Sequence, residues 1–586
     1  MKVNGLFKTK CYFVLLIILM IPTLLIFYKY MYVLHPEVAF MDTLRFLTYF
    51  ENSERGTASL FSTWNQGEHR GFIPQISVYL NAKFFKLDVF GATLSSGIVL
   101  ALTGILLGLE QCRTLSEKGR QQLSWIPFIS LVVFTYFALF SLANWELYSL
   151  DVGVVLFGKN LVFILYWIGL DRVLGDSRQQ PVLQWALLLS GPLIVLVLAF
   201  GWSYAFVLTT MITAFLASPA NKETKRFRSY LLFVLFISQI IYVVVGYSLG
   251  AGSYAVPGKI ASVGNVFIGF LFALSSGFMG TETITSLGMP VWGQLVPSIM
   301  LMGSVVWLSL NIVLSKFKMP LVAVALVIYA VFHMIAVSYS RGRFDPRLAM
   351  APRYYMDISL FFIGVFWIAI LFIKDGDLTK FTKKIVTIMS LILVLFFLVG
   401  QGITFQNEWV KAPYRHYAFN QMRNITLLGV NNIEEARTLQ APNIQVAQNG
   451  VNVQRVFGLG PFRQVGCSTP IYISGLFDKD ENGWIGKEAK MVIKNCGGNL
   501  KLKVFVPDSF LAKMIWVSID GGQLFQAQLV PGQETGFDVP VQEKNAQYLN
   551  VTVIVDITTR PSDLQLGSSD TRSLGIVISS ITTKNY

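Results

Sequence analysis

The sequence predicts a polytopic α-helical membrane domain of about eleven spans, followed by an all-β sandwich or jelly-roll domain. The chain of 586 residues is 54% hydrophobic and only 14% charged, whereas a soluble domain has roughly a quarter of its residues charged. Apolar runs that are long enough to cross a hydrocarbon core about 30 Å thick recur up to about residue 405. From residue 467 onward, apolar and polar residues alternate in short stretches, which is the period of a half-buried strand. We therefore divide the chain into a transmembrane domain at 1–405, a linker at 406–466 and a β-sandwich domain at 467–586.

The formal net charge of +14 comes largely from lysines and arginines in short loops between the apolar runs. Such loops favour the cytoplasmic side, so the sequence predicts the N-terminus inside and the C-terminus outside. A basic patch interleaved with stacking aromatic residues, which is typical of a nucleic-acid surface, does not stand out. Membrane lipids are therefore expected partners, and nucleic acid is not.

The predicted spans differ in length. The first, 11–32, has no small-residue cleavage site after it, which favours a retained span over a cleaved leader. The glycine-rich stretch 262–280 is predicted to re-enter or to lie at the interface, because a full span there would put Lys316 and Lys318 outside. Its glycines and serines permit a broken helix that is shielded by protein. The spans are roughly 11–32, 89–109, 124–143, one ending near 170, two short ones within 183–217, and then 229–249, 291–314, 320–338, 356–373 and 385–405.

The linker is polar with helix-like patches, and the tail has short strands separated by turns rich in Asn, Asp and Gly. This spacing favours a β-sandwich. Cys467 and Cys496 both fall in the tail. An exported tail would allow a disulfide between them, and two free buried thiols are the alternative, since spacing alone cannot decide the pairing. The predicted strands are 471–474, 489–493, 500–506, 514–519, 548–557 and 574–581.

The first outer loop carries the first candidate site. Asp42 lies about ten residues past the first span, among apolar neighbours. A carboxylate at a membrane surface can act as a general base for an acceptor hydroxyl or bind a metal that holds phosphate; capping of the following helix is the alternative. Further along the loop, Glu68, His69 and Arg70 place an acid, an imidazole and a guanidinium side by side, and a solvated turn is the alternative there.

A second candidate site lies at the outer ends of later spans. Arg343, Arg347 and Arg353, with Tyr354, lie on the side where arginines are disfavoured. An anionic ligand such as a lipid phosphate would explain them, and snorkelling to headgroups is the alternative. Trp145 and Glu146 form an outer turn that could line a cavity or belong to an interfacial aromatic belt.

Three short motifs carry a family resemblance: residues 67–74 (GEHRGFIP), Trp145-Glu146 and Pro352-Arg353-Tyr354. Together with the topology of 1–405, they resemble a group of bacterial polytopic proteins of the GT-C glycosyltransferase type. The chain departs from that pattern at Gly67, where Asn is usual, at Pro352, where Ser is usual, and in having Asp42 in place of a pair of acids. The tail resembles appended carbohydrate-binding β-sandwiches, through Asp480, Gly483-Trp484 and residues 570–575 (DTRSLG).

The resemblance implies transfer of a sugar from a polyprenyl-phosphate-linked donor to a cell-envelope glycan or lipid acceptor. It implies a bacterial inner membrane with the tail in the periplasm. Asp42 would be the catalytic base, and Arg343, Arg347 and Arg353 would hold the lipid phosphate. Glu68, His69 and Arg70 would position donor or acceptor. No cofactor is required, although a divalent metal is allowed. The alternatives are a transporter or flippase of a lipid-linked saccharide, and a non-catalytic glycan-binding envelope protein.

Overall fold

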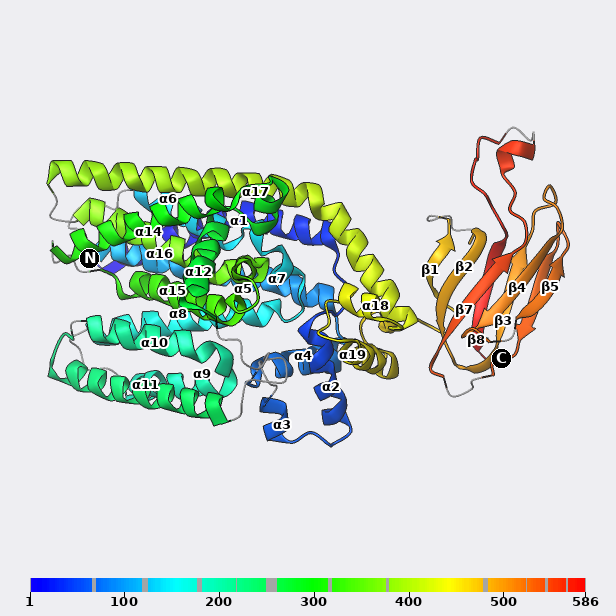
Figure 1. The fold of residues 1–586 in the computed structure, drawn as a ribbon, viewed down its shortest axis with the longest axis horizontal. Coiled ribbons are helices and arrows are strands. Elements are labelled where there is room, and N and C mark those ends of the chain that lie inside the picture. Colours follow the sequence, from blue (N-terminus) through cyan, green and yellow to red (C-terminus); the bar gives the residue numbers. More distant parts are fainter. Residues whose placement is uncertain are drawn as a thin grey trace. The chain divides into compact units, whose positions relative to one another are not determined.

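The chain folds into two compact units (Figure 1). The computed structural model describes residues 2–65, 70–117, 125–175, 182–217, 219–248, 261–314, 319–375, 379–477, 483–522, 524–542, 546–564 and 568–584. The first unit, here the helical unit, comprises Met1–Pro36, Arg55–Val78 and Val89–Tyr417. The second, here the tail unit, comprises Glu37–Glu54, Tyr79–Asp88 and Ala418–Tyr586. Two helices, α4 (Ile73–Phe85) and α17 (Lys380–Leu428), run from one unit into the other.

The helical unit is that of a multi-pass membrane protein. Among the described residues, nine helical segments are long and apolar enough to cross a membrane. They correspond to α1 (Lys2–Leu34), α5 (Val89–Glu117), α6 (Trp125–Leu139), α8 (Gly153–Gly175), α11 (Lys222–Ser248), α14 (Val291–Leu314), α15 (Leu321–Gly342), α16 (Tyr355–Asp375) and α17.

Three apolar helices of the helical unit are shorter. They are α9 (Val182–Leu198), α10 (Phe200–Leu216) and α12 (Val263–Phe278). At 1.5 Å per residue, a helix of 17 residues is about 26 Å long, slightly less than the hydrocarbon core. The nine long segments match nine of the eleven predicted spans, and α9 and α10 lie where the two short spans are predicted.

The predicted break within 262–280 is not seen, because α12 is continuous from Val263 to Phe278. Its glycines serve close packing instead. A Cβ atom on Gly269 would lie 3.1 Å from the Cβ atom of Ser338 on α15, which is tighter than ordinary contact. The helix ends at Phe278, with Met279 as its C-cap, and α13 (Thr281–Ser286) follows.

The two ends of the helical unit differ in chemistry. At one end, Arg113 of α5 pairs with Glu110 and with Asp171 of α8, and Lys374 of α16 donates to the Leu115 carbonyl. We call this the basic end. The other, here the network end, carries the short elements η1 (Leu142–Asn144), α7 (Trp145–Ser149), α13, η2 (Pro346–Met350) and η3 (Pro352–Tyr354).

The helical part of the tail unit is held by the packing of α2 (Asp42–Glu54) against α19 (Ile444–Phe457). A Cβ atom on Gly450 would lie 2.6 Å from the Leu44 carbonyl oxygen, so only glycine allows this approach. The Met41 amide donates to the Leu439 carbonyl, just after α18 (Ile433–Thr438). The helix α17 continues to Leu428, so the predicted boundary at 405 falls inside a helix.

The C-terminal part of the tail unit is an all-β domain of two antiparallel sheets. One sheet has the order β1-β2-β7-β4-β5 and the other has the order β6-β3-β8. Buried side chains of both sheets, such as Val504 of β3 and Val553 of β7, share one hydrophobic core, as in a sandwich. The strands are β1 (Ile471–Leu476), β2 (Ile485–Lys494), β3 (Gly497–Phe505), β4 (Lys513–Ile519), β5 (Phe525–Leu529), β6 (Glu534–Val539), β7 (Tyr548–Val555) and β8 (Val577–Lys584).

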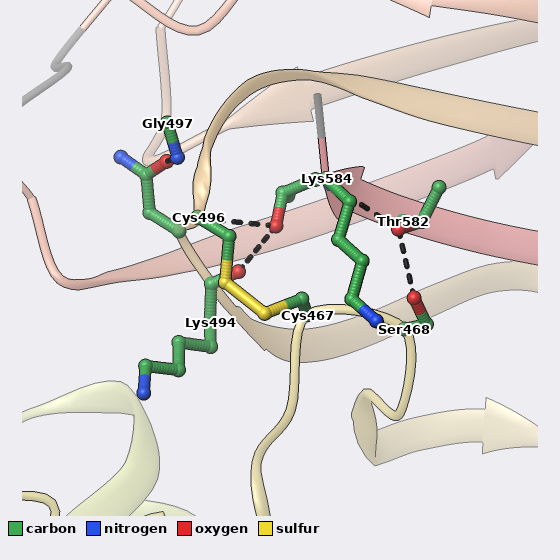
Figure 2. Close-up of a disulfide and its surroundings, with 9 residues drawn as sticks. Cys467, Ser468, Lys494, Cys496, Gly497, Thr582 and Lys584 are labelled. Carbon is green, nitrogen blue, oxygen red and sulfur yellow. Dashed lines mark hydrogen bonds between the residues drawn. A yellow bond between two sulfur atoms is a disulfide. The ribbon is translucent and has the colours of Figure 1, made fainter. Parts of the chain in front are cut away.

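A disulfide joins Cys467, just before β1, to Cys496, in the turn between β2 and β3 (Figure 2). The two Cα atoms are 5.9 Å apart. Next to it, the Thr583 hydroxyl accepts from the Cys496 amide and donates to the Lys494 carbonyl. The last strand and the β2–β3 turn are therefore fastened together around the disulfide.

Candidate functional site

The first contact of the site joins two residues that the sequence singles out. Glu146 lies on α7, in the short reversal between α6 and α8, and Arg353 lies on η3, where the chain enters α16. Arg353 Nη1 donates to Glu146 Oε1 over 2.9 Å. Glu146 is buried. A charge-assisted hydrogen bond of this kind is shorter and stronger than a neutral one.

A second contact extends from Trp145. The guanidinium of Arg415, on α17, lies 3.3 Å from the centre of the Trp145 ring. Arg415 also donates to Glu408 Oε2 and to Glu282, on α13, over 2.6 and 2.7 Å. One arginine is thus held between an aromatic face and two carboxylates, which fixes its plane.

A third contact lies deeper in the bundle. Lys159 of α8 meets both carboxylate oxygens of Asp357, on α16, at 2.9 and 3.0 Å. The Asn160 amide and the Tyr329 hydroxyl, on α15, donate to the same carboxylate over 2.8 and 3.2 Å. The Lys159 ammonium also lies 5.4 Å from the Trp202 ring centre. A buried ion pair needs such additional partners, because removing two charges from water is costly.

His333 and Tyr354 link the deep pair to the first contact. His333 Nε2 lies 3.3 Å from Asp357 Oδ2, and the rings of His333 and Tyr354 are 6.0 Å apart. Arg341, in the last turn of α15, donates to the Tyr354 hydroxyl over 3.2 Å. We call the whole set the polar network: Trp145, Glu146, Lys159, Glu282, His333, Arg341, Arg353, Tyr354, Asp357, Glu408 and Arg415.

The charges of the network stay near one end of the bundle. Lys159 is about 9 Å along α8 from its first residue, and His333 is about 13 Å from the last residue of α15, at 1.5 Å per residue. Asp357 lies in the first turn of α16. Half of a hydrocarbon core is about 15 Å. The network is therefore confined to one half of the bundle.

Four of the site residues predicted from the sequence belong to the network: Trp145, Glu146, Arg353 and Tyr354. Arg343 and Arg347 lie on the neighbouring loop. The Arg343 guanidinium covers the ring of Phe344, and Arg347 is exposed, with its backbone amide capped by Asp345. Arg343 is half-buried and Arg347 is exposed, and among the contacts described above neither joins the network.

The first outer loop is described only in part. Glu68 and His69 lie outside the described residues, as does Asp480 of the tail. Arg70 is buried and donates to Asn65 Oδ1 over 3.1 Å. Its guanidinium lies 5.7 Å from the ring of Phe200, two residues before Trp202 on α10. Arg70 therefore anchors the loop at the junction of α9 and α10.

Asp42 belongs to the tail unit and opens α2. Its carboxylate lies 3.9 Å from the Arg45 guanidinium one turn later, and its side chain is 39% exposed. An acid in the first turn of a helix is stabilised by the amide groups that point toward it. Stabilisation of the start of α2 therefore explains the position of Asp42, and it corresponds to the helix-capping alternative that the sequence leaves open.

Sequence reasoning missed seven residues of the network: Lys159, Glu282, His333, Arg341, Asp357, Glu408 and Arg415. A usable signal existed for Lys159 and Asp357, since each is a charge inside an otherwise apolar run, and such residues usually have a partner and a function. Glu408 and Arg415 fall in the stretch that the sequence assigns to a polar linker. Charged residues are common in a polar linker. These two stand out only because the structure shows that α17 continues to Leu428.

Among the described residues, no group of three or more His, Cys, Asp or Glu side chains is placed to hold a metal ion. An apolar cleft lies between α14, α16 and α17, lined by residues such as Trp307, Val365 and Leu393. Val365 is about 12 Å along α16 from Asp357. The cleft therefore lies about 12 Å farther along α16 than Asp357, the network residue on that helix.

Comparison of the chain with family models, with curated proteins and with solved structures gives no match.

Proposed function

We propose that the chain is a membrane glycosyltransferase that moves a sugar from a polyprenyl-phosphate-linked donor to a cell-envelope glycan or lipid acceptor. The proposal places the network end at the periplasmic face of a bacterial inner membrane. Such a reaction needs cations for the phosphate, a carboxylate for the acceptor proton, and access for a lipid chain.

The observation that carries the proposal is the contact of Glu146 with Arg353 at the rim of a network confined to one half of the bundle. A transferase needs its charges on one face only, where donor and acceptor meet. A transporter of the same lipid would need a polar path through both halves, because a charged headgroup is costly in hydrocarbon. The depth of Lys159, Asp357 and His333 favours the transferase.

Each group has a defined part in the proposed reaction. Arg353 and Arg341 would hold the phosphate, since planar guanidinium groups suit phosphate oxygens. The ion pair of Lys159 with Asp357 would fix α8, α15 and α16 beneath them. The apolar cleft between α14, α16 and α17 would take part of the lipid chain. Asp42, and the buried carboxylate of Glu146, are the candidates to receive the acceptor proton.

The test is a transfer assay with the full chain in lipid nanodiscs. The donor is a polyprenyl-phosphate-linked [14C]hexose panel, the acceptor is a delipidated envelope extract, and the readout is label in new glycosidic linkage. We expect transfer by the wild type and a loss of tenfold or more in Arg353→Ala, because a hydrogen bond to a charged group contributes about 1.5–3 kcal/mol. The matched control is Arg172→Ala, at the opposite end of α8, where transfer should stay unchanged.

Two outcomes would overturn the proposal. One is binding or movement of the labelled lipid across proteoliposomes without a new glycosidic bond, which would indicate a transporter. The other is equal transfer by wild type and Arg353→Ala.

A further inference from the structure

We infer that Glu146 is the general base of the site, and that it takes the proton from the acceptor hydroxyl. This inference rests on the proposed function and names the catalytic group within it. It differs from the expectation that the acid of the first outer loop does this work.

The two oxygens of Glu146 have different surroundings. Oε1 accepts the hydrogen bond from Arg353. Among the described residues, no donor contacts Oε2. The Glu146 side chain is only 9% exposed. One oxygen therefore orients the carboxylate, while the other has no donor among the described residues.

The other acids of the network are more heavily occupied. Asp357 meets Lys159 through both oxygens and also accepts from Asn160 and Tyr329. Glu282 meets Arg415 through both oxygens, and Glu408 Oε2 meets Arg415 twice. A carboxylate whose lone pairs are taken by several cationic donors is stabilised as the anion and is a poor proton acceptor. Asp357 and Glu282 are therefore poorer bases than Glu146, which has a single donor among the described residues, and Glu408 is more deeply buried than Glu146.

The position of Glu146 also fits the chemistry. The guanidinium of Arg353, which contacts Glu146, is the one assigned to the donor phosphate. The anomeric carbon of a sugar on that phosphate would therefore lie close to the Glu146 carboxylate. In the reaction, Glu146 Oε2 takes the proton of the acceptor hydroxyl, and the acceptor oxygen forms the new bond to the anomeric carbon. The bond from that carbon to the phosphate oxygen breaks, and its electron pair leaves with polyprenyl phosphate, whose charge Arg353 meets. The proton on Glu146 then passes to solvent.

Asp42 has a competing structural explanation. It lies in the first turn of α2 with Arg45 nearby, so its charge already stabilises a helix. Its side chain is also far more exposed than that of Glu146.

The test compares Glu146→Gln with Asp42→Asn in the transfer assay with the polyprenyl-phosphate-linked hexose. Gln keeps an oxygen that can accept from Arg353 but cannot take a proton. General bases contribute about 10²–10⁴-fold, so we expect kcat to fall at least 100-fold in Glu146→Gln while KM for the donor stays within about threefold. In Glu146→Gln, the remaining kcat/KM should no longer fall as the pH is lowered. Asp42→Asn tests the alternative base, and Glu434→Gln, at an exposed acid of α18, is the control that should keep kcat within about threefold.

A second variant, Glu146→Ala, distinguishes loss of the base from loss of folding. Added formate should restore part of the activity of Glu146→Ala, because it can occupy the vacated space and accept the proton. The inference is overturned if Glu146→Gln keeps more than a tenth of wild-type kcat, if Asp42→Asn abolishes transfer, or if both Glu146 variants lose donor binding without rescue. A wild type that forms no glycosidic bond overturns the proposed function and this role together, whereas an active wild type with an active Glu146→Gln overturns this role alone.

Discussion

Removing one charge of the buried pair between Lys159 and Asp357 should destabilise the helical unit strongly. The ammonium meets both carboxylate oxygens at 2.9 and 3.0 Å. At an effective dielectric constant of about 20, two unit charges about 3 Å apart attract by roughly 5 kcal/mol. Asp357→Asn removes this attraction and leaves the ammonium buried between aromatic rings. Breaking a buried pair by removing one partner costs about 3–5 kcal/mol.

Replacing both residues should cost much less than the sum of the two single changes. Lys159→Met with Asp357→Leu removes both charges and fills the space with apolar atoms, and such replacements are often close to neutral. We expect a coupling free energy of about 3 kcal/mol in the double-mutant cycle. The exposed pair of Glu434 with Arg437 on α18 is the matched control, and its cycle should show little coupling.

The assay is reversible unfolding of the full chain in detergent micelles, followed by tryptophan fluorescence, for the four members of each cycle. Each single change at the buried pair should lower the midpoint temperature by something on the order of 5–10 °C. Additive effects, or a loss of less than about 1 kcal/mol in Asp357→Asn, would contradict the reasoning. Either result would mean that water reaches the pair.

Three further predictions concern other parts of the chain. Replacing both Cys467 and Cys496 by Ser should destabilise the β domain by about 3.6 kcal/mol, since the disulfide closes a loop with a sequence separation of 29; the urea midpoint for proteolysis of the tail measures this. Burial lowers the pKa of Lys513 from 10.5, so the unfolded chain binds that proton more tightly and stability should rise with pH toward 10.5. Lys513→Met should abolish that rise in the same proteolysis assay. Gly364→Ala should cost about 1–3 kcal/mol in thermal unfolding, because its Cβ atom would lie 2.7 Å from the Ala323 carbonyl oxygen.

Each of these three has a contrary outcome. An unchanged midpoint in the Cys→Ser variant under oxidising conditions would mean that the loop is already ordered in the unfolded chain. A pH slope that persists in Lys513→Met would assign the slope to another group. Gly303→Ala is the control for Gly364→Ala, since nothing lies within 4 Å of its Cβ position; equal losses in the two variants would contradict the packing argument.

The fold class could be predicted because its determinants are local. An apolar run of about twenty residues must be helical in a membrane, and alternation with period two must be a strand. The strands β5 and β6 were missed. They cover 525–539, where Gln, Glu and Gly interrupt the apolar side of the alternation. The length of α17 was missed because its second half is polar and reads as a linker.

The candidate site could be predicted only where unusual residues lie in a loop. Trp145-Glu146 and Arg353-Tyr354 were found in this way, but their contact was not, since 207 positions separate Glu146 from Arg353. The partner of Lys159 lies 198 positions away. Contacts of this length depend on how the helices cross, and neither composition nor spacing carries that information.

Pro413 removes one backbone hydrogen bond from α17, next to the network residues Glu408 and Arg415. A proline has no amide hydrogen, so the Trp409 carbonyl loses its helical partner one turn earlier. Glu408 and Arg415 lie on either side of this gap, and their ion pair crosses it. The ion pair therefore joins the turns on either side of Pro413 and stabilises the helix where a backbone hydrogen bond is missing.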